Sequence, residues 1–448
     1  MSPVAVTDAR SRAVLVALAV LVVLSGCTAP TTGGHPDGDP NSDRLGWENG
    51  HWYDDDLSLT PADGYNASER EALVARTMAR VERIRRLEFN STVPVDVVSR
   101  EQYLANRSSG NASAVHGRWN DQVWESLFIV GEQSSFSNSS DDTLGQTVQG
   151  YYSPGKDAIV VVSDSSTPTI DRATLAHELV HALQDQHFGF GPNAETQDRQ
   201  LAERGVTEGD ARYVESIYSR RCESEWSCIP EPEPSGGGGA SADYNRGLFL
   251  TIYTPYAAGS QFIDRVRDRG GWSAVDDLYG EWPDSTEQII HPDLYPNEQP
   301  VNVTVPDRSS EEWHRFDVDP VADTVGEASI YAMLVHNGAV DPENRYGYRS
   351  KPSAGWGGDS VVPYTNGTAG AYVWTTAWDT ETDATQFLDA YREVLAHHDA
   401  RNPRGNVYVV PEDDPFGDAF RVVRNGKRVR IVNAPTVDAL DEVHSRSG

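Results

Sequence analysis

Residues 174–186 contain two histidines and a glutamate in the order His177-Glu178-x-x-His181. On an α-helix, residues four positions apart differ in direction by only about 40° and lie one turn apart, so both imidazoles can face one metal ion. Zinc lowers the pKa of a bound water to about 7, and a neighbouring carboxylate that takes its proton produces a nucleophile. The spacing therefore predicts a zinc site with Glu178 as general base. The alternative is a buried helix whose histidines only form hydrogen bonds.

A zinc site with one open position needs a third protein ligand, and the sequence offers two candidates. His187 matches the last histidine of the longer pattern HExxHxxGxxH, but Gln184 stands where that pattern needs a glycine to break the helix. On an unbroken helix, the six residues from His181 to His187 turn through about 600°, which places His187 on a different face. We therefore favour the second candidate, Glu208.

Glu208 lies in the segment 203–215, where we expect a helix to start after Gly205 and to present this carboxylate to the ion from its first turn. Asp210 and Glu215 in the same segment are candidate hydrogen-bond partners for the zinc-bound histidines. The alternative is that these acidic residues only complement the positive end of a helix dipole.

A zinc hydrolase usually also carries a donor that stabilises the oxyanion opposite the metal. We expect His291, Tyr256 or Gln288 to supply it. The alternative for the segment around His291 is a short structural helix, capped by Ser285 and ended by Pro292.

Periodic apolar residues predict the elements that position these side chains. A helix is expected over residues 66–87, strands at 94–98 and 159–162, and the helix of the two histidines from Asp171. Beyond them the patterns predict a helix around 328–334, a strand over 371–378, a helix over 384–397, and a terminal β-hairpin whose strands, 420–424 and 428–432, flank Asn425-Gly426-Lys427. The predicted fold class is α+β.

The predicted organisation is a helix-rich zinc core over residues 45–300 and a C-terminal α+β part over 301–448 that packs on it. Residues 229–241 are rich in Pro and Gly, with four consecutive glycines, and are expected to form a flexible surface loop between two helices of the core.

The N-terminus predicts export. Two arginines precede an apolar run of 12 residues, 13–24, which is too short to span a bilayer as a helix. The run ends in Leu-Ser-Gly-Cys, which resembles a lipoprotein processing site. Residues 1–26 are expected to be a signal peptide, Cys27 the site of lipidation, and residues 27–44 a disordered tether on the extracellular face of the membrane. An ordinary signal peptide with an incidental cysteine is the alternative.

The other two cysteines, Cys222 and Cys228, are close in sequence and are expected to form a disulfide outside the cell. N-glycosylation acceptors agree with this location, and some are expected to be modified. They are Asn66, Asn90, Asn106, Asn111, Asn138, Asn302 and Asn366.

Acidic residues number 68 against 37 basic ones, which gives a formal net charge of −31. Such a charge makes nucleic acid a poor partner. Because only three of the basic residues are lysines and the charge is spread along the chain, we interpret it as a surface adapted to concentrated salt, which screens self-repulsion. The alternative is an acidic face that binds a basic partner or calcium.

The string HELVHALQDQHF followed by TEGDARYVES resembles the gluzincin type of zinc peptidase and, more narrowly, a group of haloarchaeal surface lipoproteins with an HELxHALQDQ motif. Further blocks of that group occur over most of the mature chain, at residues 255–259, 270–272, 285–292, 355–359 and 378–380. The resemblance implies a gluzincin-like core with zinc at His177, His181 and Glu208, and Glu178 as general base. It implies no particular substrate.

The expected function is a cell-surface zinc metallopeptidase that hydrolyses peptide bonds in a peptide or protein substrate. Two alternatives are a non-catalytic zinc-binding surface or adhesion protein, and a zinc amidase acting on envelope polymers.

Overall fold

The computed structural model describes residues 42–107, 113–144, 148–232, 244–342, 344 and 346–446. The expected signal peptide, the lipidation site Cys27, most of the tether, the acceptor Asn111 and residues 233–241 of the expected loop lie outside the described residues. Among the described residues, no helix combines the length and the apolar character needed to cross a bilayer.

The first long helix, α1 (Ala67–Arg85), is set by its caps. The Asn66 side chain accepts the Glu69 backbone N–H while the Glu69 carboxylate accepts the Asn66 N–H, so two amides that a helix start leaves unpaired are satisfied. The helix predicted over residues 66–87 is confirmed, except that it ends earlier because Arg86 takes a left-handed conformation with φ 61°.

A three-stranded sheet lies beside the helices, with the order β3-β5-β4. β3 (Val95–Val98) and β5 (Ala158–Val162) are parallel, and β4 (Gly150–Ser153) is antiparallel to β5. All five residues of β5 are buried, which explains why its sequence is continuously apolar. The strands predicted at 94–98 and 159–162 are confirmed.

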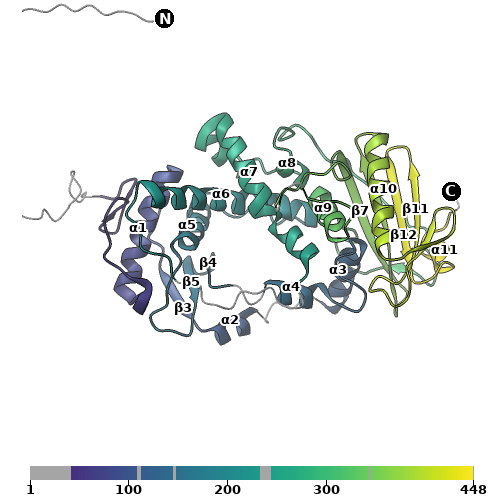
Figure 1. Ribbon diagram of the computed structural model, residues 1–448, viewed down its shortest axis with the longest axis horizontal. Helices are drawn as coiled ribbons and strands as arrows, with labels where there is room; N and C mark the ends of the chain where they lie inside the picture. Colours follow the sequence, from purple (N-terminus) through teal and green to yellow (C-terminus); the bar gives the residue numbers. More distant parts are fainter. Residues whose placement is uncertain are drawn as a thin grey trace, which may run out of the picture. The chain divides into compact units, whose positions relative to one another are not determined.

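Three long helices follow: α5 (Arg172–His187), α6 (Gln197–Ser224) and α7 (Arg246–Asp277), with α7 kinked at Gly271. The predicted start of α5 is confirmed, because the Asp171 side chain accepts the Thr174 N–H as its N-cap. α6 packs on both α5 and α7 (Figure 1).

The prediction that a helix starts after Gly205 is wrong. α6 begins eight residues earlier, capped by Thr196, and Glu208 lies in its interior. Gly205 is a packing residue, because a Cβ there would lie 2.9 Å from the Ile289 side chain. A Cβ on Gly209 would lie 2.5 Å from the backbone of Gly259 on α7, so the glycines allow the two helices to approach closely on either side of Glu208.

Residues 314–434 supply a seven-stranded antiparallel sheet, with the order β6-β7-β8-β12-β11-β10-β9. Its strands are β6 (His314–Arg315), β7 (Trp356–Thr365), β8 (Gly370–Trp378), β9 (Arg401–Arg404), β10 (Val407–Val409), β11 (Ala419–Asn425) and β12 (Arg428–Ala434). The predicted strand 371–378 corresponds to β8. The predicted hairpin is β11–β12, in which Asn425 pairs with Arg428 across Gly426 and Lys427.

The two faces of this sheet belong to different apolar clusters. Val361 and Trp374 join the large core of the helical part, whereas their sequence neighbours Val362 and Val373 join a smaller cluster with Leu440. This alternation is the period of two that a β-strand imposes on its side chains. The helices predicted around 328–334 and over 384–397 are α9 (Gly326–His336) and α10 (Glu381–His397), both on the large-core side, where α10 lies along the strands (Figure 1).

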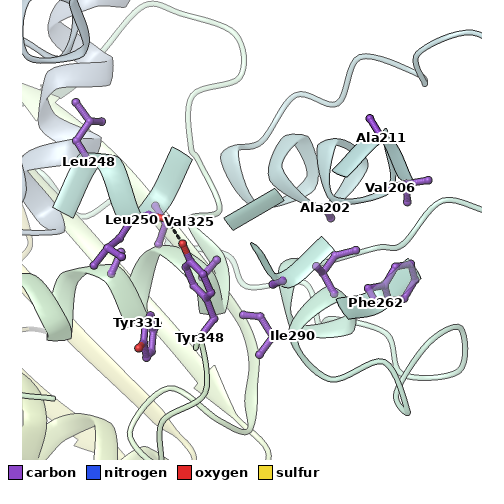
Figure 2. Packing of buried hydrophobic residues seen from close by; sticks show 14 of the residues in the cluster. Ala202, Val206, Ala211, Leu248, Leu250, Phe262, Ile290, Val325, Tyr331 and Tyr348 are labelled. Carbon is purple, nitrogen blue, oxygen red and sulfur yellow. Dashed lines mark hydrogen bonds between the residues drawn. The ribbon is translucent and has the colours of Figure 1, made fainter. Parts of the chain in front are cut away.

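The same large core runs between α6, α7 and α9 without interruption. Figure 2 shows Leu250 of α7 and Tyr331 of α9 around Tyr348, whose hydroxyl donates to the Leu250 carbonyl at 2.6 Å. The C-terminal sheet and the helices therefore share one interior, and the α+β class is confirmed.

The remaining elements are short. They are β1 (Trp47–Glu48), β2 (His51–Trp52), a 3₁₀-helix (Pro61–Asp63), α2 (Arg100–Arg107), α3 (Ala114–Ser126), α4 (Phe136–Leu144), α8 (Thr286–Ile290) and α11 (Ala439–Val443). Cys222 and Cys228 are joined by a disulfide. The surface loop expected over residues 229–241 follows this disulfide. Its first residue lies inside the protein, because Ile229 is only 4% exposed and its carbonyl accepts a hydrogen bond from the Arg172 guanidinium.

Candidate metal centre

Helix α5 brings the two histidines of the motif together. The rings of His177 and His181 have centroids 4.9 Å apart and lie nearly perpendicular to each other, at 83°. Their side chains are only 10% and 12% exposed. Two neighbouring imidazoles on one face of a buried helix can bind the same metal ion, as the four-residue spacing predicts.

The carboxylate of Glu208 reaches both rings from α6. Its Oε2 atom lies 3.2 Å from Nε2 of His177 and 3.3 Å from Nε2 of His181. Zinc bonds of about 2.0–2.1 Å at a tetrahedral angle place two donor atoms about 3.3–3.4 Å apart. The measured distances between Oε2 and the two nitrogens match the edge of such a tetrahedron.

The opposite nitrogen of each ring is held by another side chain. Nδ1 of His177 lies 3.2 Å from Oε2 of Glu215, and Nδ1 of His181 lies 2.9 Å from Oε1 of Gln184. The orientation of the Gln184 amide is fixed, because its Nε2 donates to the Thr207 carbonyl at 2.9 Å. Both partner atoms are acceptors, so each Nδ1 carries the proton and each Nε2 of a neutral ring presents its lone pair to Glu208.

Two nitrogen lone pairs and one carboxylate oxygen repel each other unless a positive charge lies between them. In the absence of a metal ion this charge is supplied by protons. Burial alone would lower the pKa of His177, but its bonds to Glu208 and Glu215 raise that pKa to about 10. Burial likewise opposes the charge of His181, and Glu208 raises the pKa of His181. The donor set of two imidazoles and one carboxylate fits zinc, which would take the place of these protons.

Glu208 itself remains ionised. Burial would raise its pKa, but the charges of His181 and His177 hold the pKa of Glu208 below its usual range. A permanently negative third donor increases the attraction of the site for a divalent cation.

Glu178, the expected general base, follows His177 on α5 and is held by a contact with the small sheet. Its Oε2 atom accepts the backbone N–H of Tyr152 at 2.9 Å, which ties the carboxylate to strand β4. Its charge raises the pKa values of both His177 and His181, so it lies within electrostatic reach of each. Its role as a group acting on a water at the ion stays a prediction of the motif.

Tyr256 comes to the same place from α7. Its ring stacks on His177, with centroids 6.0 Å apart and planes at 18°. Burial and the negative charges of Glu208 and Glu178 raise the pKa of its hydroxyl, which therefore stays protonated and can donate a hydrogen bond. Tyr253 and Phe249 continue the stack along α7, with successive centroids 5.6 Å and 5.1 Å apart.

His291 and Gln288 do not join this group. His291 Nε2 lies 3.1 Å from the buried carboxylate of Glu327. Gln288 is buried and accepts the N–H of Asp284 through its side chain. In the described part of the chain, neither residue has a hydrogen bond or ion pair with His177, His181 or Glu208. Of the three expected oxyanion donors, Tyr256 is therefore the one that lies at the site.

His187 and Asp210 also belong to other contacts. His187 Nε2 lies 2.7 Å from the carbonyl oxygen of Glu88, in agreement with its expected position on a different face of α5. Asp210 accepts both the Arg85 guanidinium and the Tyr279 hydroxyl, and it lies 3.5 Å from Gln184 Nε2. Asp210 therefore lies next to Gln184, the hydrogen-bond partner of His181, and its own hydrogen bonds in the described residues go to no histidine.

Gln184 is the functional residue that sequence reasoning missed. In the pattern HExxHxxGxxH it marks only the absence of the required glycine, although it lies three positions after His181 and thus on the same face of α5. A hydrogen-bonding residue at that spacing from a candidate ligand is the signal that could have identified it.

Comparison with known proteins gives a match in the C-terminal part of the chain. A family model described as a domain of unknown function (DUF8575) matches residues 314–444, which include every element from β6 to α11. His177, His181 and Glu208 lie outside the matched region. No curated protein matches the chain. The similarity to this domain of unknown function therefore concerns residues 314–444.

Proposed function

We propose that this protein is a zinc-dependent peptidase that acts outside the cell while anchored to the membrane by a lipid on Cys27. One observation carries the proposal: Glu208 from α6 approaches Nε2 of both His177 and His181, while acceptors at Nδ1 of the two rings direct both lone pairs toward it. Two imidazoles with fixed tautomers and one carboxylate leave the fourth position of a tetrahedron for water or substrate, as a catalytic zinc site requires.

A zinc ion at these donors would supply Lewis acidity to a water molecule and to a substrate carbonyl. Glu178 accepts a proton from the attacking water and passes it to the leaving amine. Tyr256 donates its hydroxyl hydrogen to the oxygen on which negative charge develops. Gln184 and Glu215 hold the imidazoles in the required tautomer and orientation.

A place for the peptide is provided by β4, whose only strand partner among the described residues is β5. An edge strand offers unpaired backbone groups to an extended peptide, which can be added as a further strand. Because Tyr152 of β4 donates its N–H to Glu178, a chain bound along this edge would pass next to the general base.

The extracellular location is supported by chemistry in two parts of the chain. The disulfide between Cys222 and Cys228 forms and persists in oxidising compartments. Together with the processing site before Cys27, it favours a cell-surface lipoprotein whose substrate is a peptide or protein.

The test is the substitution Glu178→Gln in the purified protein, assayed on an unfolded protein substrate in concentrated salt. Loss of the proton acceptor is expected to lower kcat by about 10²–10⁴-fold. Zinc content, measured by atomic emission, should stay at one ion per chain because Glu178 is not a ligand. Glu195→Gln, an exposed position in the loop before α6, is the matched control and should retain full activity.

Three outcomes would overturn the assignment. Unchanged hydrolysis in Glu178→Gln would exclude its role as general base. Zinc bound at full occupancy together with no turnover of any peptide library would favour a non-catalytic zinc-binding surface protein, and turnover of envelope polymers alone would favour an amidase.

A further inference from the structure

Helix α6 carries an arginine one turn away from Glu208 on either side. Arg204 lies four residues before Glu208 and Arg212 four residues after it, and all three lie inside one continuous helix. Positions four apart on a helix point in nearly the same direction. Both arginine side chains therefore leave α6 on the face that carries the third candidate ligand of the metal centre. Both are exposed to solvent.

Arg212 is engaged within the protein. Its guanidinium pairs with Oε1 of Glu215, and the other carboxylate oxygen of Glu215 lies 3.2 Å from Nδ1 of His177. Arg212 therefore supports the residue that orients a candidate metal ligand, and its positive charge is balanced by that carboxylate.

Arg204 is not engaged in the same way. Among the described residues its side chain has no ion pair, hydrogen bond or ring contact. Glu208 stands at the spacing at which a helix favours an ion pair with Arg204, but its carboxylate is directed to the two imidazoles. The chain has 68 acidic residues against 37 basic ones, so its composition does not favour an arginine without an acidic partner.

The positive charge of Arg204 acts on the metal centre. Burial and the charges of Glu208 and Glu178 raise the pKa of the Tyr256 hydroxyl, and the charge of Arg204 lowers it. The guanidinium of Arg204 therefore lies within electrostatic reach of the expected oxyanion donor. The helical register with Glu208 and this effect on Tyr256 both place Arg204 beside the candidate site.

The charges around the candidate site leave one positive side chain without a counterpart. A divalent ion would balance the carboxylates of Glu208 and Glu178, and histidines that bind zinc are neutral. Arg212 already balances Glu215. Arg204 then remains unbalanced, and a substrate that carries its own carboxylate would compensate it. A guanidinium binds a carboxylate through two parallel N–H···O bonds, which fix the orientation of the bound group as well as its charge.

We propose that Arg204 determines the substrate class by binding a carboxylate that lies close to the scissile peptide bond. This inference rests on the proposed peptidase function and adds to it the chemistry of the substrate. The carboxylate has two sources, the free C-terminus of a peptide and the side chain of an Asp or Glu residue. In both cases Arg204 contacts the substrate and takes no part in binding the metal ion.

The first measurement is of binding and needs no turnover. The full chain with the substitution Glu178→Gln is titrated calorimetrically with a short neutral peptide that has a free C-terminal carboxylate, and with the amide of the same peptide. A second pair of peptides is blocked at both ends and contains one Glu or one Gln. The carboxylate member of a pair should bind about 10–100-fold more tightly than its neutral partner. The pair that shows this preference identifies the source of the carboxylate.

Further substitutions assign the preference to Arg204. With Arg204→Gln, the carboxylate peptide should fall to the affinity of its neutral partner. Arg204→Lys keeps the charge without the planar guanidinium and should retain part of the preference. Arg220→Gln is the matched control, because Arg220 is an exposed arginine of the same helix about 24 Å further along the axis, and it should leave the preference intact. The ratio of two affinities within one variant cancels any general effect on folding.

In the active protein, Arg204→Gln should raise KM for the carboxylate peptide with little change in kcat, because the lost contact is made equally in the ground state and the transition state. Equal binding of both members of every pair, or a preference that persists in Arg204→Gln, would refute the role of Arg204. Hydrolysis of both members with equal kcat/KM would refute this inference and leave the peptidase proposal standing. A binding preference that depends on Arg204, without hydrolysis of any peptide, would refute the peptidase proposal alone.

Discussion

Gln184 Oε1 lies 2.9 Å from His181 Nδ1, and the Nε2 atom of the same amide is committed to the Thr207 carbonyl. The glutamine thus cannot rotate to offer a donor, and His181 must carry its proton on Nδ1. In the proposed zinc site, His181 would be a ligand oriented by a residue that itself contacts no metal.

The first prediction concerns this relationship. Gln184→Ala should weaken zinc binding by about 10–100-fold, which is the usual effect of losing the partner of a metal-bound imidazole. Competition with a chromophoric chelator measures the affinity. Gln261→Ala, at an exposed position on α7, should bind zinc normally. Equal affinities in the two variants would show that Gln184 does not orient the ligand.

The second prediction assigns the oxyanion donor to Tyr256. Tyr256→Phe keeps the ring that stacks on His177 but removes the hydroxyl. We expect kcat to fall by about 10²–10³-fold with little change in KM, because the lost bond forms only as charge develops. Zinc content should be unchanged, and Tyr408→Phe on β10 is the control. A rise in KM with normal kcat would instead indicate a role in substrate binding.

The third prediction concerns removal of the metal. Zinc bound at the proposed site would stabilise the folded protein by about 2.7 kcal/mol when its concentration is a hundred times Kd. Thermal unfolding with zinc should therefore give a higher Tm than unfolding with a chelator. In Glu208→Gln the carboxylate is lost, and the difference between the two conditions should shrink toward zero. A zinc effect that persists in this variant would mean that the stabilising ion binds elsewhere.

The fourth prediction tests the support behind the metal centre. Arg85 and Asp210 form a buried ion pair at 3.1 Å, and Asp210 also receives the Tyr279 hydroxyl. Asp210→Asn removes one of the two carboxylate partners of the guanidinium, because Asp276 Oδ1 lies 2.6 Å from Arg85 Nη1. The loss of the buried charged hydrogen bonds should lower the free energy of unfolding by about 1–3 kcal/mol. Denaturant titration measures the loss.

The exposed pair of Arg392 and Asp389 is the matched control for that experiment. Arg392→Ala should change stability by about 1 kcal/mol or less, because solvent screens the pair. A similar loss in both variants would show that burial does not distinguish the two pairs.

The fifth prediction is a pH dependence of stability at Glu48 and Glu82, two neighbouring buried carboxyls. Burial and the charge of Glu82 raise the pKa of Glu48 to about 9, and burial raises the pKa of Glu82 to about 7. The unfolded chain releases these protons near pH 4.3. The stabilisation is therefore complete below about pH 4 and is lost as pH rises through about 7 to 9.

Glu48→Gln removes one of the two charges and should flatten this decline above about pH 7, so that the variant becomes more stable than the wild type near pH 9. Chemical denaturation at several pH values provides the comparison, with the exposed Glu71→Gln on α1 as control. Parallel pH profiles for the wild type and Glu48→Gln would contradict the assignment.

Patterns in the sequence predict a helix or a turn correctly where its formation depends on residues close to one another in the chain. Asp171 and the apolar positions after it predicted α5, and Asn425-Gly426 predicted the hairpin, because capping and turn geometry are decided within a few residues. The same locality paired His177 with His181, since a helix fixes the direction of side chains four positions apart.

Local patterns do not predict contacts between residues that are far apart in the sequence. Gly205 looks like a helix breaker in the sequence, yet it is a helical residue because another element packs against it. His291 and Tyr256 were equally good candidates until packing placed one beside Glu327 and the other on His177.

The amino-acid sequence by itself therefore determined the chemistry on α5: two imidazoles, an adjacent carboxylate and the helix that displays them. The tertiary structure decided which of the candidates come to the two imidazoles, namely Glu208, Glu215 and Tyr256, and it alone added Gln184. The physical reason is that helix periodicity acts over one or two turns, whereas the crossing of α5, α6 and α7 depends on close packing of glycines and buried side chains from the whole chain.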